Sequence, residues 1–284
     1  MPGKAFLEIT NACNLSCSFC HGTKREIKYI TEEEFTLAAT QIRQHAEYLY
    51  FHLLGEPLLH PKLAKFLCIA KELGFKVVLT TNGTLLYKCR EILLSEYAPF
   101  KVNISLHSYE VNKIGITLSQ YLDMCFDFCK NGSRKGIICV MRLWNKGSEN
   151  NTLNDEIISG MHKFFDESST SGWKETYSGY KICDRIFLEW GEKFEWPDID
   201  GEIVGENHSC YGLRDQFGVL SDGTVVPCCL DADGSINLGN IFKTPLSEIL
   251  SSPRAMALRK SFINKDIKEE LCRRCGYAKM KNYR

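Results

Sequence analysis

The sequence predicts an α/β protein in which helices cover a parallel sheet, followed by a small unit built from a β-hairpin and a helix. Two observations carry this prediction. Apolar segments of strand length alternate with amphipathic helical segments through the first two thirds of the chain, and the strand segments are apolar on both faces. Parallel strands packed between helices have this character, and a curled sheet of this kind places its site at the C-terminal strand ends. Spacing alone fits either a partial barrel or an open doubly wound sheet.

The expected elements follow in order along the chain. Strands are expected at about 5–9, 48–54, 75–80, 101–106, 137–142 and 185–190. Helices are expected at about 31–47, 60–73, 87–97, 117–130 and 153–166, and Thr31 with Glu34 forms a capping box that opens the first. Past the last strand, segment 187–198 mixes acidic with aromatic residues. This segment is either a substrate wall joining two domains or a packed linker.

Three cysteines follow the first strand at the spacing C-x3-C-x2-C, namely Cys13, Cys17 and Cys20. Thiolates grouped in a short loop favour an iron–sulfur cluster or zinc, because both prefer soft sulfur ligands. A closed site normally takes four protein ligands, so three leave one coordination position for a substrate or cofactor. The simpler alternatives are a structural zinc knot or three unconnected core cysteines.

This motif, with the aromatic Phe19 before its last cysteine, resembles the signature of the radical S-adenosylmethionine (SAM) enzymes. The resemblance implies a 4Fe–4S cluster on the three cysteines that also binds SAM, with Phe19 beside the cofactor. Reductive cleavage of SAM, fed by a donor such as flavodoxin or ferredoxin, then gives a 5′-deoxyadenosyl radical that abstracts a substrate hydrogen atom. It also implies the fold, a partial (β/α)6 TIM-like barrel over about residues 1–190.

The resemblance further implies which residues bind SAM. Gly55 and Glu56, after the second strand, are similar to the family segment that receives the SAM amino group, although Leu54 replaces its first glycine. Asn82 ends the third strand, where a SAM contact and an ordinary Asn-Gly turn are both possible. At the end of the fourth strand the family often carries a serine and an acidic residue near the SAM ribose and carboxylate; Ser105 matches the serine, whereas His107 departs from the acidic version.

Three further residues are expected to act on the substrate. Arg142 ends the fifth strand, and a buried cation there must be paired, either with a SAM carboxylate or anionic substrate group or with a barrel carboxylate such as Glu56 or Glu189. Glu189 could instead bind a polar substrate group. In a redox-neutral epimerase, a non-ligand cysteine such as Cys183 would return the hydrogen atom.

The C-terminal fifth carries a second set of cysteines. A hairpin with Asp222-Gly223 at its turn folds Cys228 back beside Cys210, and Cys272 with Cys275 forms a C-x2-C pair. By itself this set is typical of a zinc ribbon. Together with the N-terminal motif it resembles the SPASM/twitch extension, which implies an auxiliary 4Fe–4S cluster on these four cysteines. Cys229 could replace Cys228 as a ligand, although the family spacing favours Cys228.

Composition limits the class of partner. The 284-residue chain has 35 basic and 35 acidic residues and therefore no global field for nucleic acid, and no apolar run long enough to span a membrane. We expect a cytoplasmic enzyme with a barrel at 1–190, a linker at 191–207 and an auxiliary cluster domain at 208–284. Its substrate is expected to be a peptide or protein side chain. The alternatives are a dehydrogenase or epimerase of a small polyol or aminosugar, and a non-catalytic zinc-ribbon binding module.

Overall fold

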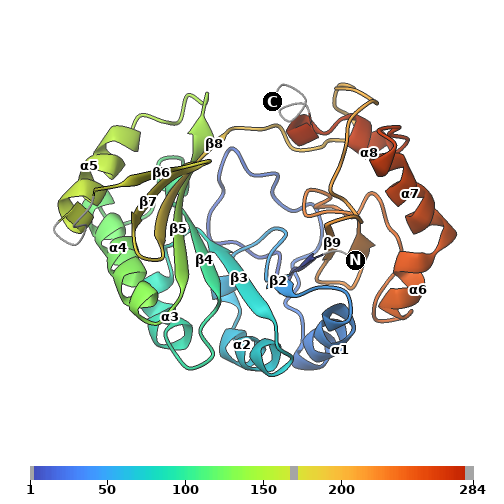
Figure 1. Ribbon diagram of the computed structural model, residues 1–284, viewed down its shortest axis with the longest axis horizontal. Helices are drawn as coiled ribbons and strands as arrows, with labels where there is room; N and C mark the ends of the chain where they lie inside the picture. Colours follow the sequence, from blue (N-terminus) through green and yellow to red (C-terminus); the bar gives the residue numbers. More distant parts are fainter. Residues whose placement is uncertain (1–2, 167–171, 279–284) are drawn as a thin grey trace.

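The computed structural model describes residues 3–166 and 172–278. Its strands form one ten-stranded sheet in the order β10-β9-β1-β2-β3-β4-β5-β8-β7-β6. The sheet curls around a central space and the helices lie outside it (Figure 1). The predicted partial barrel is confirmed, and the six strands expected from the sequence are parallel neighbours: β1 (Lys4–Leu7), β2 (Tyr48–Tyr50), β3 (Lys76–Thr81), β4 (Lys101–Ser105), β5 (Ile138–Lys146) and β8 (Ile186–Glu192).

The outer face of this sheet packs on five helices. These are α1 (Glu32–Arg43), α2 (Leu63–Glu72), α3 (Leu86–Leu93), α4 (Leu118–Arg134) and α5 (Asn154–Phe165). Thr31 and Glu34 form the predicted capping box, with a hydrogen bond in each direction. Beneath it, Phe35 of α1 stacks on Phe66 of α2 with ring centroids 4.2 Å apart, and both are fully buried. Alternation along the strands gives their outward side chains to this core and turns the others inward.

A hairpin that the sequence analysis missed follows α5. Strands β6 (Lys174–Thr176) and β7 (Gly179–Cys183) are antiparallel and add to the edge of β8. A Cβ atom on Gly179 would lie 2.1 Å from the carbonyl oxygen of Leu188, so the close approach of β7 to β8 requires glycine.

The course of β7 corrects the prediction for Cys183. Because β7 runs antiparallel to β8, Cys183 pairs with Ile186, the first residue of β8. Cys183 therefore lies at the N-terminal end of the barrel strands and packs against the outer core. The cluster loop leaves the opposite end, so Cys183 cannot return a hydrogen atom there.

The predicted C-terminal hairpin is present, and its placement is unexpected. Strand β9 (Gln216–Val219) pairs in parallel with β1, and β10 (Val225–Val226) follows in antiparallel after the Asp222-Gly223 turn. The sheet thus continues from the barrel into the cysteine-rich region. Three helices complete this region: α6 (Leu246–Ser251), α7 (Pro253–Ile263), which was not predicted, and α8 (Glu270–Arg273). In the part of the chain described, no helix has the length and apolarity of a membrane span.

Candidate active site

The loop that leaves β1 brings its three cysteines together. Cys13 and Cys20 are exposed and Cys17 is half-buried. Burial, followed by the nearby negative charges of Cys20 and Cys13, raises the pKa of Cys17 to about 11. Thiolates that interact in this way repel one another, and the positive charge of bound iron offsets that repulsion and so favours the deprotonated, ligating form. The donor set therefore fits an iron–sulfur cluster with one position left open.

Two asparagine side chains reach this cysteine loop. Asn112 donates its amide to the sulfur of Cys17 at 3.1 Å and accepts the backbone N–H of Ser16 at 3.0 Å. Asn82, at the end of β3, donates to the side chain of Asn14 at 3.0 Å and lies 4.0 Å from the sulfur of Cys13. The structure thus places Asn82 beside the cysteine loop. Asn112 was missed because it stands in a polar loop without a motif.

The segment after β2 packs directly beneath the loop. Gly55 has a φ of +76°, and a Cβ there would lie 2.3 Å from the carbonyl oxygen of Thr10, so only glycine fits. The carboxylate of Glu56 is buried and accepts the backbone N–H groups of Asn82 at 2.8 Å and Leu58 at 3.0 Å. Burial raises the pKa of Glu56 to about 7. Glu56 therefore holds the ends of β2 and β3 together rather than presenting its carboxylate to a ligand.

The end of β4 supplies a second support for the loop. The ring of His107 lies 4.7 Å from that of Phe19, and its Nδ1 lies 3.1 Å from the carbonyl oxygen of Arg142. Burial lowers the pKa of His107 to about 4, so the imidazole is neutral at pH 7. Ser105 is half-buried at the last position of β4, in register with Arg142 of β5. His107 thus positions Phe19 by packing against it.

A charged group lies on the inner face of the barrel. The Nε of Arg142 lies 3.1 Å from one carboxylate oxygen of Glu189, and the Nζ of Lys101 lies 3.8 Å from the other. The Arg142 guanidinium also covers the ring of Trp144, 4.4 Å from its centroid. Of the two partners that the sequence offered for Arg142, the structure uses Glu189 and not Glu56. Lys101 and Trp144 were missed, since neither belongs to a motif.

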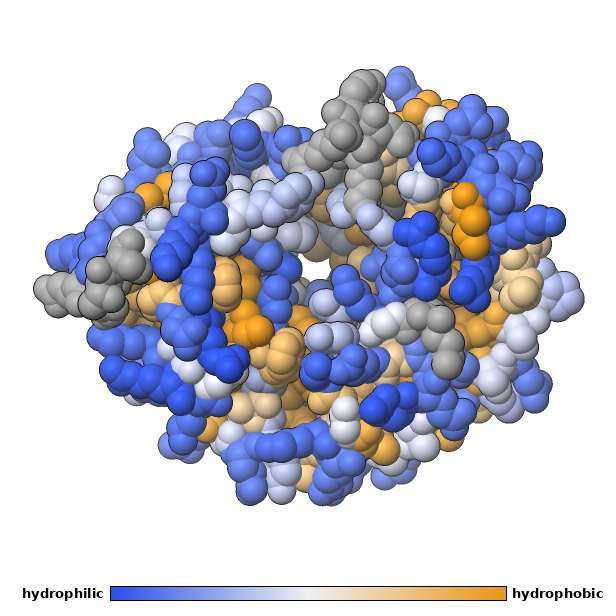
Figure 2. All heavy atoms as spheres, viewed as in Figure 1, coloured by the Kyte–Doolittle hydropathy of each residue, from blue (hydrophilic) through white to orange (hydrophobic). Residues whose placement is uncertain are grey.

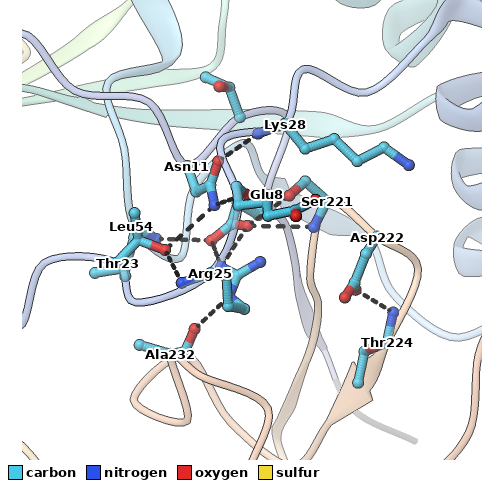
Figure 3. A network of polar contacts seen from close by, with 12 residues as sticks. Glu8, Asn11, Thr23, Arg25, Lys28, Leu54, Ser221, Asp222, Thr224 and Ala232 are labelled. Atoms are coloured by element: carbon cyan, nitrogen blue, oxygen red, sulfur yellow. Dashed lines mark hydrogen bonds and ion pairs between the residues drawn. The ribbon is translucent and has the colours of Figure 1, made fainter.

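A buried network connects the cysteine loop to the C-terminal hairpin (Figure 3). The carboxylate of Glu8, which is fully buried, pairs with Arg25 at 2.7 and 2.8 Å. The same carboxylate accepts the hydroxyl of Ser221 at 2.9 Å and lies 3.4 Å from the backbone nitrogen of Leu54. Arg25 also donates to the carbonyl of Ala232 at 3.0 Å. One carboxylate thus joins β1, the turn before Gly55, and the hairpin.

The second set of cysteines lines one cavity. Cys210, Cys228, Cys272 and Cys275 all face a cavity of about 50 Å³. One water needs only about 10–15 Å³ on this measure, so the space exceeds that of a single water. Cys229 is not among its lining residues and packs instead against Phe6, Leu53, Leu220 and Val226 inside the barrel. In the described part of the chain, no three His, Cys, Asp or Glu side chains converge on a single ion. Four sulfurs around this space suit a cluster.

The segment 194–197, which we call the strap, lies between the two cysteine sets. The indole of Trp196 donates to the carbonyl of Phe19 at 3.0 Å. The ring of Phe194 lies 5.6 Å from that of Tyr277, and Pro197 lines the cavity of the second set. A Cβ on Gly276 would lie 2.4 Å from the carbonyl oxygen of Glu195, so the strap touches the C-x2-C turn. The strap is therefore a packed linker, whereas Glu189 just before it faces the barrel interior.

Two family models match the chain. The model of the radical SAM superfamily matches residues 7–154, and the model of the SPASM iron-sulfur cluster-binding domain matches residues 210–276. These ranges contain every cysteine of the two sets.

Curated relatives match the chain in part. The sporulation killing factor maturation protein SkfB of Bacillus subtilis is 24% identical over 295 residues, covering 91% of this chain and 67% of SkfB. A probable GTP 3',8-cyclase of Sulfurisphaera tokodaii is 31% identical over 137 residues, covering 45% of this chain and 42% of that protein. A tungsten-containing aldehyde ferredoxin oxidoreductase cofactor-modifying protein of Pyrococcus furiosus is 31% identical, covering 37% of this chain and 30% of that protein. The chain thus spans less than half the length of these last two relatives.

Solved structures share the fold. The crystal structure of BtrN with AdoMet and 2-DOIA has a TM-score of 0.62 at 18% identity, covering 97% of this chain and 93% of BtrN. The structure of anSMEcpe with bound AdoMet has a TM-score of 0.62 at 16% identity, covering 98% and 85%. The structure of Streptococcus suis SuiB with S-adenosylmethionine has a TM-score of 0.60 at 16% identity, covering 97% and 70%.

Proposed function

The chain belongs to the radical SAM superfamily, and from this we propose that it abstracts a hydrogen atom from a peptide or protein side chain and thereby oxidises or otherwise matures it. Its cofactors are SAM and two 4Fe–4S clusters, as the two matched family models imply. The observation that carries the proposal is that both cysteine sets border one barrel and are joined by the strap and by the Glu8 network.

Three cysteines, Cys13, Cys17 and Cys20, would hold the first cluster, and the cluster with SAM supplies a 5′-deoxyadenosyl radical for hydrogen abstraction. The residues of the chain bind and orient. Gly55 keeps the turn after β2 against the loop, and Asn82 reaches the loop from β3. Asn112 fixes the sulfur of Cys17 by an N–H to sulfur contact, which also affects the potential of a cluster.

The second cluster would be held by Cys210, Cys228, Cys272 and Cys275. Four cysteine ligands leave no iron open to a substrate, so this site suits the transfer of one electron away from the substrate radical that hydrogen abstraction leaves. Cys229, which packs on the barrel side and does not line the cavity, is not assigned as a ligand in this proposal. The electron donor for the first cluster is proposed to be a protein such as flavodoxin or ferredoxin.

A peptide substrate is supported by two likenesses. SkfB, whose name describes maturation of a sporulation killing factor, aligns with 91% of this chain. Another fold neighbour, anSMEcpe, has been solved with bound AdoMet and a peptide. A small polyol or aminosugar is the second candidate; its support is the fold likeness to BtrN, which was solved with AdoMet and 2-DOIA and aligns over 97% of this chain and 93% of its own.

The test is anaerobic reconstitution followed by iron, sulfide and zinc analysis of the parent and of the Cys13→Ala/Cys17→Ala/Cys20→Ala variant. Two clusters predict roughly eight irons in the parent and about four in the variant. The parent with SAM and dithionite should then form 5′-deoxyadenosine and the variant should not. Zinc in place of iron at the C-terminal set would remove the electron-transfer role. A protein that binds zinc alone and forms no 5′-deoxyadenosine would contradict the whole proposal.

A further inference from the structure

We propose that the inner face of the barrel holds a subsite for a carboxylate group of the substrate, bound by Arg142 and Lys101. This inference rests on the proposed function, since it names the chemical class of the group that enters the barrel. These residues stand on the inner faces of β4, β5 and β8, which border the central space of the curled sheet (Figure 1), and the space-filling view shows a narrow opening near the middle of the molecule (Figure 2). We call this space the lumen.

The first argument is the charge balance of the lumen. Lys101 and Arg142 both contact Glu189, so two cations share one carboxylate and one positive charge is left over. Burial disfavours that excess and lowers the pKa of both Lys101 and Arg142. Two fully buried carboxylates elsewhere in the barrel are already engaged, Glu8 with Arg25 and Glu56 with backbone amides. The side chains of Lys101 and Arg142 are 25% and 16% exposed, and cations largely removed from water are stabilised by a partner, so we expect an anion to bind in the lumen.

The second argument is the orientation of Arg142. Its Nε is held by Glu189, and no residue in the described part of the chain accepts a hydrogen bond from its two terminal nitrogens. Trp144 covers the guanidinium face, and a Cβ on Gly191 would lie 2.6 Å from the Trp144 ring, so the indole is fixed against β8. A guanidinium held at its Nε and at its face presents its remaining N–H groups for paired hydrogen bonds to a carboxylate.

The third argument comes from two buried polar atoms without a partner. The Oδ1 of Asn103 and the Nδ1 of His52 are buried and make no hydrogen bond. Asn103 has no exposed surface, and its amide donates to the hydroxyl of Thr80 at 3.1 Å on the same inner face. Burial and the charge of Arg142 lower the pKa of His52 to about 3, so its imidazole is neutral and close to Arg142. Buried unpartnered atoms are uncommon, and these would bind polar atoms next to the carboxylate.

The position of Lys101 separates this subsite from the SAM residues. Asn82 and Ser105 mark the strand ends at the cysteine loop, whereas Lys101 is the first residue of β4. From Lys101 to Ser105 the strand extends about 13 Å at ~3.3 Å per residue. The cations thus continue from the level of Ser105 toward the interior of the barrel, which favours a substrate group over the carboxylate of SAM.

The experiment measures binding without turnover on the reconstituted full chain with saturating SAM and no reductant. The probes are N-acetyl-aspartate and N-acetyl-glutamate, each compared by calorimetry with its neutral amide at constant ionic strength. We expect the acids to bind at least about tenfold more tightly than the amides, as for hydrogen bonds to charged groups. Equal binding of acids and amides would overturn the proposal without any variant.

Three variants sharpen the result. Arg142→Gln should weaken binding of the acids about tenfold or more, whereas Glu189→Gln should strengthen it, because it removes the competing carboxylate. If Arg142 and Glu189 only stabilised the fold, both variants would bind the acids more weakly. Arg90→Gln is the matched control, since Arg90 pairs with Asp127 on the surface and its loss should change nothing. If Arg142→Gln fails to fold, Lys101→Gln replaces it and should likewise weaken binding of the acids, and the comparison of acids with amides in the parent still tests the proposal.

Competition with SAM distinguishes the two sources of a carboxylate. For this arm the acids are first bound to the reconstituted protein without SAM; if SAM that is then titrated in displaces them in proportion, Arg142 binds the SAM carboxylate and the substrate subsite is refuted. Since binding is measured without chemistry, a failure of this proposal is separate from an absence of 5′-deoxyadenosine, which would contradict the proposed function instead.

Discussion

The buried pair of Glu8 and Arg25 is expected to contribute strongly to stability. Replacing Arg25 by leucine leaves the fully buried Glu8 carboxylate without its cation, and breaking a buried pair in this way costs about 3–5 kcal/mol. The hydrogen bonds from Ser221 and Leu54 remain, so we place the loss near the lower end of that range. A loss of about 3 kcal/mol is equivalent to a factor of more than 100 in the folded-to-unfolded ratio.

The assay is urea unfolding of the reconstituted protein, followed by circular dichroism, in the parent, Arg25→Leu and the double variant Glu8→Gln/Arg25→Leu. The double variant should recover part of the loss, because a neutral amide is less costly to bury than an unpaired carboxylate. The matched control is Arg90→Leu, which breaks a surface ion pair worth at most about 1 kcal/mol. A loss below about 1 kcal/mol in Arg25→Leu, or a double variant less stable than the single one, would refute this reasoning.

Three further predictions concern the cofactor sites and pH. Cys228→Ala should lower the iron content by about four per chain, whereas the neighbouring Cys229→Ala should leave it unchanged. The reason is that, of these two adjacent cysteines, Cys228 lines the second cavity and Cys229 does not. Equal loss of iron in both variants would contradict the ligand set. Trp196→Phe removes the indole N–H that donates to the carbonyl of Phe19 but keeps an aromatic ring. This variant should change the electron paramagnetic resonance spectrum of the first cluster and leave the iron content unchanged. An unchanged spectrum would show that the contact does not position the cysteine loop. Burial lowers the pKa of His52 from 6.5 to about 3, so between these pH values the unfolded chain binds a proton that the folded chain does not. The free energy of unfolding should therefore fall as the pH drops below about 6.5, by up to about 1.4 kcal/mol per pH unit. In His52→Gln the free energy of unfolding should depend less steeply on pH over this range, and an identical dependence would exclude the effect.

The barrel could be predicted from the sequence because its signals are local. Continuous apolar strands such as 48–54 and the capping box at Thr31 each specify their own element, and the alternation of elements specifies parallel pairing. The cysteine spacings likewise identify both sulfur sets, and Asp222-Gly223 identifies the turn that returns Cys228 to its partners. The inward position of Arg142 follows from simple alternation along β5.

What could not be predicted depends on tertiary neighbours. Strand β6 is exposed throughout and β7 buries only Ile182 fully, so neither has an apolar pattern that marks it as a strand; β7 pairs with the edge of β8. The partnership of Glu8 with Arg25 joins a strand residue to a polar loop, and neither residue stands in a motif. The location of Cys183 could not be predicted for the same reason, since it depends on the direction of β7. Asn112 contacts Cys17 across 95 positions of sequence, which no local pattern reveals.

The parallel pairing of β9 with β1 also affects the order in which the chain folds during synthesis. Lys4 pairs with Gln216, so one side of the first strand stays without its neighbour until more than 200 further residues have been translated. At about 5–20 residues per second, that interval lasts roughly 10–40 s. During this time β1 is an edge strand with open N–H and C=O groups, which is where unwanted pairing between nascent chains begins. We therefore expect the ribosome-bound barrel to depend on chaperones until the C-terminal hairpin emerges and closes that edge.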